Sequence, residues 1–331
     1  MNRAVIAHAP TRLDFGGGWT DVPPYPEREG GAVCNVAITR YATVTAATGE
    51  PGAGSGYTRR SGEDDLIRAA LRRSGSEHAD VRLSSDFPVA AGLGGSAAAG
   101  VALAGALAIL SGSPLQPHAL AALSRDTEVT GLGVPGGFQD HYAASFGGAL
   151  LITFANLVQV RRLECRDQTF AELAQRGVLV YSGESRMSGA TITAVSDAYR
   201  AGDRVVVDAL ARMKALAFEM ADALVTGDLD ALGALTGEHW IYQRALHPSI
   251  TTARIDAIMV AASRAGALGA KALGASGGGC VLAIAARGRE DELARALSPF
   301  GERLSYAVDT KGFDVVDAVE STEASMEGQT R

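Results

Sequence analysis

Residues 88–98 read PVAAGLGGSAA, and this glycine-rich run is the most informative segment of the chain. Gly92, Gly94 and Gly95 allow the backbone to turn without Cβ clashes, so that N–H groups face a single point. Ser96 and the small residues after it are typical of a helix start, which carries partial positive charge. Exposed N–H groups at a helix N-terminus bind anions, and the run therefore predicts a phosphate site.

The loop pattern alone is compatible with more than one kind of site. Residues 92–97 fit the G-x-G-x-x-A pattern of a Rossmann loop, although residues 112–120 lack the acidic residue that this fold requires. A Walker A loop is excluded, because the chain contains no G-x-x-x-x-G-K-[ST]. A structural glycine turn without any ligand stays open when this segment is considered by itself.

Two carboxylates flank a second glycine-rich turn at residues 131–137. Glu128 precedes the turn and Asp140 follows it. Phosphoryl transfer requires a Mg²⁺ ligand and an acceptor for the proton of the nucleophile, and two such carboxylates suit those roles. The alternative is structural: Glu128 lies on a solvated helix face, and Asp140 caps the following helix. His141, next to Asp140, is a candidate for tuning the site.

These segments together resemble the GHMP kinases, whose nucleotide loop reads P-x-x-x-G-L-G-S-S-A. Only Gly95 departs from the fixed positions, where it replaces the first serine. The resemblance implies that ATP is the cofactor, with Mg²⁺ bound by Ser96 and Glu128 and Asp140 as the catalytic base. It assigns the nucleotide to Pro88, Gly92, Leu93, Gly94, Gly95, Ser96 and Ala97.

The first 24 residues continue the resemblance. They resemble the A-P-x-R-I-x-F-x-G-G-x-T-D segment of heptose-phosphate and fucose kinases, which implies that Arg12 lies beside Asp140. A cation there keeps the carboxylate ionised. Asp21 is the expected partner of sugar hydroxyls, while Trp19 either stacks on the sugar or simply packs. The substrate residues implied are Gly18, Trp19, Thr20, Asp21, Gly137, Arg186, Gly277 and Gly278.

Residues 266–280 resemble the third family motif, G-A-x-G-x-K-x-x-G-A-G-G-G-G. The glycines at 277–279 predict a close approach of this backbone to the glycine loop. Arg186 is placed in a T-G-x-x-R segment, as a ligand of a substrate phosphate or as a surface arginine. The heptose branch has W-x-x-K-R where this chain has Gln243, so the lysine is lost and the substrate is expected to differ. Cys280 has no partner base and is predicted to be inert.

The composition limits the classes of function. The 331 residues carry a net charge of −7 without a basic block, which argues against nucleic acid as a partner. The N-terminus lacks the apolar region of a signal peptide, and the most apolar run, residues 97–110, is too short to cross a bilayer. We therefore expect a cytoplasmic protein with no membrane partner. A homodimer is one option for its assembly, which the sequence does not decide.

The order of predicted elements indicates an α+β fold. Strands are predicted at residues 4–9, 13–15, 32–48, 81–87, 149–154, 158–163, 178–182, 271–273, 281–285 and 304–308, and helices at 64–73, 97–110, 119–128, 188–200, 205–226, 229–243 and 251–266. The resemblance implies an N-terminal lobe similar to ribosomal S5 domain 2, residues 1–175, and a ferredoxin-like C-terminal lobe, residues 176–331. It implies phosphorylation of a sugar or sugar phosphate, such as a heptose 7-phosphate. Another sugar-1-kinase, a cyclitol kinase and a non-catalytic sensor are the alternatives.

Overall fold

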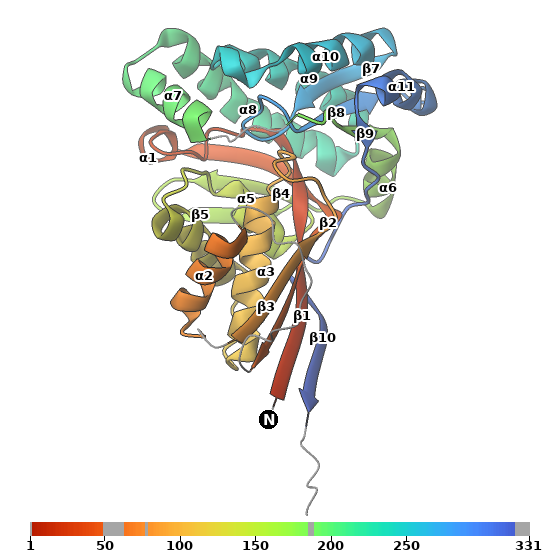
Figure 1. Cartoon of the computed structure of the whole chain (residues 1–331). Coiled ribbons are helices and arrows are strands. Elements are labelled where there is room, and N and C mark those ends of the chain that lie inside the picture. The colour runs from red at the N-terminus through yellow and green to blue at the C-terminus, as the bar shows by residue number, and fades with distance from the viewer. Residues whose placement is uncertain (1, 49–62, 77–78, 185–188, 322–331) are drawn as a thin grey trace, which may run out of the picture.

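The computed structural model describes residues 2–48, 63–76, 79–184 and 189–321. Two lobes lie one above the other, each built on its own sheet (Figure 1). The first sheet has the order β10-β1-β2-β4-β5, and β3 pairs with the far end of β2. Its strands are β1 (Asn2–Gly16), β2 (Gly31–Thr48), β3 (Ala79–Ser85), β4 (Ala149–Phe154), β5 (Val158–Arg162) and β10 (Asp314–Ser321).

Helices cover one face of this sheet, with α3 at the centre. They are α2 (Glu63–Ser74), α3 (Gly95–Leu110), α4 (Pro117–Asp126), the π-helical turn η1 (Thr127–Gly131) and α5 (Gln139–Phe146). The short α1 (Tyr25–Glu29) and α6 (Asp167–Arg176) lie nearer the second lobe (Figure 1). Because α3 packs against β1, β2, α4 and α5, it is buried on almost every side, which explains its Ala-, Gly- and Leu-rich sequence.

The second lobe contains a four-stranded antiparallel sheet of order β7-β8-β6-β9. The strands are β6 (Gly177–Tyr181), β7 (Ala267–Ala272), β8 (Cys280–Ala285) and β9 (Glu302–Arg303). The helices are α7 (Gly189–Arg200), α8 (Arg204–Thr226), α9 (Leu229–Ala245), α10 (Ala253–Arg264) and α11 (Glu290–Leu297), with short 3₁₀ turns η2 (Pro248–Ile250) and η3 (Ser298–Phe300). This succession of strands and helices is that of a ferredoxin-like lobe, so the predicted α+β class is confirmed.

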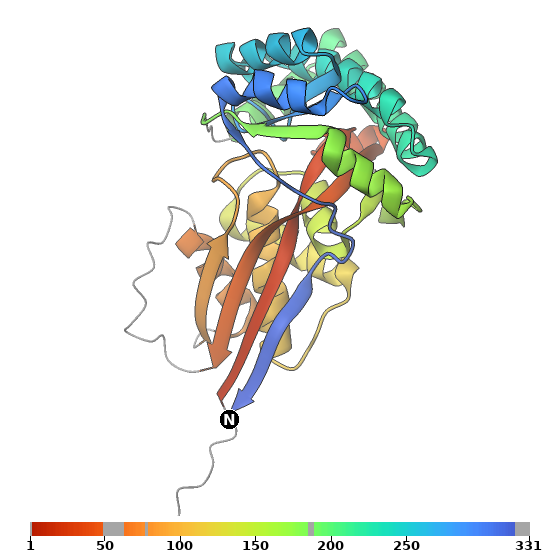
Figure 2. The same cartoon turned by 90° about the vertical axis from the view of Figure 1, so that its right-hand side faces the viewer.

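Several predicted elements differ from the structure. The two N-terminal strands are one strand, β1, which passes Pro10 because the pairing with β2 shifts register directly after it. Residues 304–308 form no strand, and only Val308 makes an isolated bridge, to Ile38. The last strand, β10, returns to pair with β1 in the first sheet (Figure 2). Residues 314–321 thus belong with the first lobe, although a division at residue 175 assigns them to the second. That boundary otherwise stays a prediction.

No helix in the described ranges is long and apolar enough to cross a membrane. The longest, α8, is amphipathic, with buried side chains along one side and charged residues along the other. Its first turn is capped by Asp203, whose carboxylate accepts hydrogen bonds from the N–H groups of Val205 and Val206.

A buried polar seam joins the two lobes. Nζ of Lys271, in β7, lies 3.3 Å from Oδ2 of Asp14 and donates to the carbonyl of Phe15 over 3.1 Å. Nearby, the N–H of Gly17 donates to Nε2 of His239, in α9, over 3.1 Å. Lys271 and His239 are fully buried, so these contacts hold the end of β1 against the second lobe without access to water.

We expect His239 to make the protein less stable in acid. Burial, and then the charge of Lys271, lower the pKa of this imidazole well below its ordinary value near 6.5, although Gln243 opposes the shift. As the pH falls, the unfolded chain therefore binds the His239 proton before the folded protein does. The stability that neutral His239 contributes is complete above pH 6.5 and is lost as the pH falls below that value. The slope approaches about 1.4 kcal/mol per pH unit for one proton.

Urea unfolding between pH 7.5 and 5 measures this effect. In His239→Gln an amide oxygen can accept the Gly17 N–H without titrating, and the free energy of unfolding should depend less on pH than in the wild type. Parallel pH dependence in the two proteins would contradict the assignment.

Candidate active site

The glycine loop lies directly before α3 and is pressed against the third glycine motif. Gly92 has a positive φ of 73°, and a Cβ there would lie 2.5 Å from the carbonyl oxygen of Leu273. The N–H of Cys280 donates to the carbonyl of Ala91 over 2.8 Å, and a Cβ on Gly279 would lie 2.8 Å from the same oxygen. The predicted approach of the two motifs is therefore present, and glycine is required where the backbones meet.

A single arginine joins the loop to the predicted base. Nε and Nη2 of Arg12 lie 2.8 and 2.7 Å from Oδ1 of Asp140, and Nη1 donates to the carbonyl of Gly92 over 2.6 Å. The Arg12 side chain is 4% exposed and that of Asp140 is 30% exposed. A Cβ on Gly94 would lie 3.0 Å from Cγ of Asp140, so the carboxylate lies directly against the loop. The prediction that Arg12 lies beside Asp140 is confirmed.

Glu128 is on the π-helical turn that follows α4, a geometry often found at functional sites. Oγ of Ser96 donates to its Oε1, and Nε2 of His141 lies 3.2 Å from its Oε2. Burial raises the pKa of Glu128, but the hydrogen bonds from His141 and Ser96 outweigh it, and the pKa is lowered overall. The carboxylate is therefore ionised at neutral pH. Sequence reasoning linked His141 to Asp140, whereas the structure places it against Glu128.

A second contact fixes the orientation of the His141 ring. Its Nδ1 lies 2.9 Å from Oγ of Ser124, and the ring is buried. Ser124 in turn packs against α3 at Gly100, where a Cβ would lie 2.5 Å from the hydroxyl. Two hard oxygen ligands, from Ser96 and Glu128, thus lie together at the N-terminal end of α3, a donor set that suits Mg²⁺.

The predicted sugar-binding segment is largely buried. Trp19 is 7% exposed, has a φ of 79° and belongs to the core of the second lobe. Oγ1 of Thr20 donates to the carbonyls of Gly17 and Ala32, so this side chain braces the turn after β1. Gly18 lies against Asp14. A Cβ added at Gly18 would lie 2.4 Å from Oδ2 of Asp14. These positions therefore support the turn after β1 by packing and hydrogen bonds within the chain.

The other predicted substrate residues are distributed between the lobes. Gly137 lies against Asp21, and a Cβ there would be 2.1 Å from its Oδ2. The N–H of Gly277 donates to the carbonyl of Ile250 over 2.8 Å, and Gly277 and Gly278 both have positive φ. Arg186 lies outside the described residues.

Comparison with known proteins identifies the family. Residues 64–148 match the GHMP kinase N-terminal domain and residues 220–303 match the GHMP kinase C-terminal domain. A D-glycero-alpha-D-manno-heptose 7-phosphate kinase of Campylobacter jejuni is 27% identical over 300 residues, covering 84% of this chain and 88% of that protein. A mevalonate kinase of Thermococcus onnurineus is 31% identical over 251 residues, covering 74% and 70%. The chain belongs to the GHMP kinases.

The solved structures agree with this membership. A D-glycero-D-manno-heptose 1-phosphate kinase of Bacteroides thetaiotaomicron superposes with a TM-score of 0.74 at 25% identity, covering 98% of this chain and 100% of that one. As a GHMP kinase, the protein is a phosphotransferase that uses ATP as donor and an alcohol group as acceptor. The lobes, the glycine loop and the Arg12–Asp140 pair are thus parts of a kinase.

Gln243 has a role in this GHMP kinase that the sequence did not reveal. Its Nε2 lies 3.2 Å from the carbonyl of Ala272, 3.1 Å from that of Gly274 and 2.9 Å from Oγ of Ser276. The side chain is fully buried, so its amide holds the third motif in place. Asn35 is likewise buried, and its Nδ2 donates to Oε1 of Gln139 over 3.4 Å, in keeping with a structural role.

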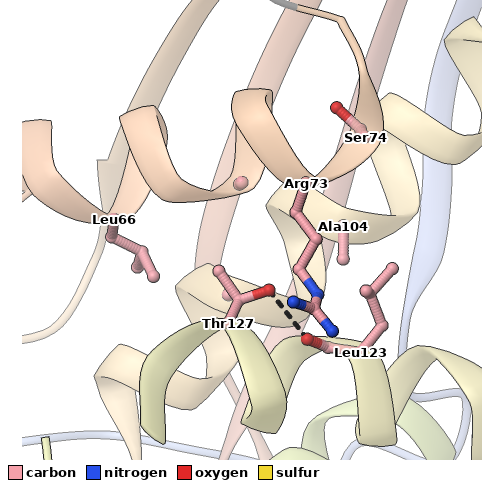
Figure 3. Close-up of a pocket in the computed structure, with 8 residues that line it drawn as sticks. Leu66, Arg73, Ser74, Ala104, Leu123 and Thr127 are labelled. Atoms are coloured by element: carbon pink, nitrogen blue, oxygen red, sulfur yellow. Dashed lines mark hydrogen bonds between the residues drawn. The ribbon is translucent and has the colours of Figure 1, made fainter. Parts of the chain in front are cut away.

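A small pocket lies between α2, α3 and α4, next to the turn that carries Glu128. Figure 3 shows the Arg73 side chain extending toward Leu123 and Thr127, and Oγ1 of Thr127 donates to the carbonyl of Leu123 over 2.8 Å. Its lining is mainly apolar and includes no carboxylate or histidine. The pocket therefore supplies none of the groups that phosphoryl transfer requires.

Proposed function

We propose that this GHMP kinase transfers the γ-phosphoryl group of ATP to a hydroxyl of a sugar or sugar phosphate, such as the anomeric hydroxyl of a heptose 7-phosphate. The observation that carries the proposal is the placement of Asp140 between Arg12 and the glycine loop. The heptose-phosphate kinases among the relatives support the acceptor class. A bifunctional fucokinase/GDP-fucose pyrophosphorylase of Arabidopsis thaliana is 26% identical over 324 residues, which make up 30% of that protein, and it keeps free sugars among the candidates.

The proposal gives each of these groups a role in the reaction. The acceptor oxygen attacks the γ-phosphorus, the bond from that phosphorus to the β,γ-bridging oxygen breaks, and ADP leaves. Asp140 takes the hydroxyl proton, and Arg12 keeps the carboxylate ionised and oriented. The loop at residues 88–97 binds the phosphates through its N–H groups and the end of α3. Mg²⁺, held by Ser96 and Glu128, would neutralise phosphate charge when bound.

A screen of ADP release tests the proposal. Free aldoses, sugar 7- or 6-phosphates and cyclitols are supplied separately with MgATP, and ³¹P NMR of the product identifies the hydroxyl that is phosphorylated. An anomeric phosphate signal is the expected result. ATP binding without ADP release from any acceptor would instead indicate a non-catalytic sensor, and a signal only from cyclitols would replace the sugar by a cyclitol.

We expect His141→Ala to weaken Mg²⁺ binding about 10- to 100-fold, because the imidazole holds Glu128 in the orientation of a ligand. Ser96→Ala should raise the Mg²⁺ requirement as well, since it removes one of the two oxygen donors. Electron paramagnetic resonance of Mn²⁺ with ADP measures the metal affinity without relying on turnover. His118→Ala, which removes an exposed histidine of α4, is the control. Unchanged Mn²⁺ affinity in both site variants would reject the metal assignment.

A further inference from the structure

The helix that carries Asp140 has no capping side chain of its own. Phe138 precedes α5 and offers no hydrogen-bond acceptor to the first turn. The first N–H groups of a helix have no partner within it, and they require one when they are buried. Gln139, the first residue of α5, is 6% exposed.

Asp21 supplies the missing cap from a distant part of the chain. Its Oδ2 accepts hydrogen bonds from the N–H groups of Phe138, over 2.8 Å, and Gln139, over 3.0 Å. Asp140 is the next residue. A carboxylate at a helix N-terminus is also stabilised by the helix dipole. The backbone directly before Asp140 is therefore held by Asp21, the side chain expected from the sequence to bind sugar hydroxyls.

The residues around Asp21 accommodate its contact with the start of α5. Asp21 is 1% exposed, so its carboxylate is embedded rather than presented to solvent. Any side chain at Gly137 would collide with it, since a Cβ there would be 2.1 Å from Oδ2. Asn35 fixes the side chain of Gln139 from the neighbouring strand β2. Three segments thus converge on the start of α5.

We propose that Asp21 is a positioning residue for Asp140, and that it acts by capping α5 rather than by binding the acceptor. Arg12 orients the carboxylate of Asp140, and Asp21 fixes the backbone directly before Asp140. Both come from β1 and the turn after it, so one N-terminal segment aligns the base with the glycine loop. The inference rests on the proposed kinase function.

The charges around Asp21 predict a pH dependence of this cap. Burial raises the pKa of Asp21 to about 6, to which Asp140 and Asp14 contribute by repulsion while the two N–H groups lower it. Arg125, on α4, is the cation that faces it. Below pH 6 the carboxylate is protonated and becomes a weaker acceptor, so kcat should fall there.

Two substitutions of Asp21 separate positioning from substrate binding. Asp21→Ala removes the cap, and we expect kcat to fall about 10- to 100-fold with the acceptor KM within about 3-fold, since small displacements of a base are costly. Asp21→Asn keeps a neutral oxygen acceptor at every pH, so its kcat should lie between those of the wild type and Asp21→Ala and should show no decline near pH 6. Asp203→Ala, which removes the cap of α8 far from the base, should leave kcat unchanged.

Other outcomes would overturn the proposal. A ligand of the acceptor would give a raised KM in both Asp21 variants with little loss of kcat. A pH profile of Asp21→Asn identical to that of the wild type would also count against the cap. Hydrogen exchange at the Phe138 and Gln139 amides, faster in Asp21→Ala under the proposal, needs no turnover. It therefore tests the cap even if the wild type releases no ADP. The absence of ADP release would contradict the proposed function alone.

Discussion

Asp140→Asn should lower kcat about 10²- to 10⁴-fold while the protein still binds ATP, because the amide cannot accept the hydroxyl proton. The nucleotide contacts that we propose lie in the loop at residues 88–97 and do not require the carboxylate. Single-turnover ADP release measures the chemical step, and calorimetry with a non-hydrolysable ATP analogue measures binding. Arg12, left without its ion-pair partner, is still held by the Gly92 carbonyl.

Asp126→Asn is the control for this substitution. It removes a partly exposed carboxylate of α4 that pairs with Arg73 of α2 and has no role in the proposed reaction. Its kcat should match the wild type, and thermal unfolding shows whether either variant has lost its structure. A folded Asp140→Asn protein that keeps more than about a tenth of wild-type kcat would mean that phosphoryl transfer proceeds without this base.

Lys271→Met should destabilise the protein by about 3–5 kcal/mol, the usual result of removing one member of a buried ion pair. Lys271 is fully buried, and the Asp14 carboxylate would lose its cation. Within the described part of the chain, Oδ1 of Asp14 already has no hydrogen-bond partner. Urea unfolding gives the free energy, and both lobes should loosen because this contact joins β7 to β1.

The double variant Asp14→Leu/Lys271→Met tests the cause. Replacing both charges with apolar side chains removes the unpaired carboxylate, so it should recover most of the lost stability. If the double variant is as unstable as the sum of the two single variants, the ion pair is not the reason for the effect.

The helices of the second lobe could be predicted closely from the sequence. The patterns at residues 205–226 and 229–243 correspond to α8 and α9, because their apolar residues recur with helical period and Asp203 and Asp228 cap their starts. Residues 290–297 form α11, which was not predicted, although its first turn is acidic as helix starts often are. Strand β10 was missed for another reason, since its partner β1 lies at the opposite end of the chain.

The motifs of the site were predicted from the sequence, but most of the hydrogen bonds that support them were not. Arg12 contacts Asp140, and Ser96 contacts Glu128, in keeping with the resemblance. Gln243 was missed as a support because a neutral amide gives no periodic or spacing signal, and His141 was linked to Asp140 although its ring lies against Glu128. Their hydrogen bonds reach residues that are more than ten positions away.

The sequence by itself determined which motifs form the candidate site, because residues 88–97, Glu128 and Asp140 match segments of the GHMP kinases. Glycine at positions 92 and 94 tolerates the left-handed backbone of this tight loop, with φ of 73° and 74°, and the family resemblance distinguishes the segment from other glycine turns. Only the tertiary structure placed the Asp21 carboxylate at the start of α5 and paired Lys271 with Asp14. An isolated carboxylate has the same chemistry whether it meets a sugar hydroxyl, a lysine or a helix end, and the partner depends on which distant segment the fold brings to it.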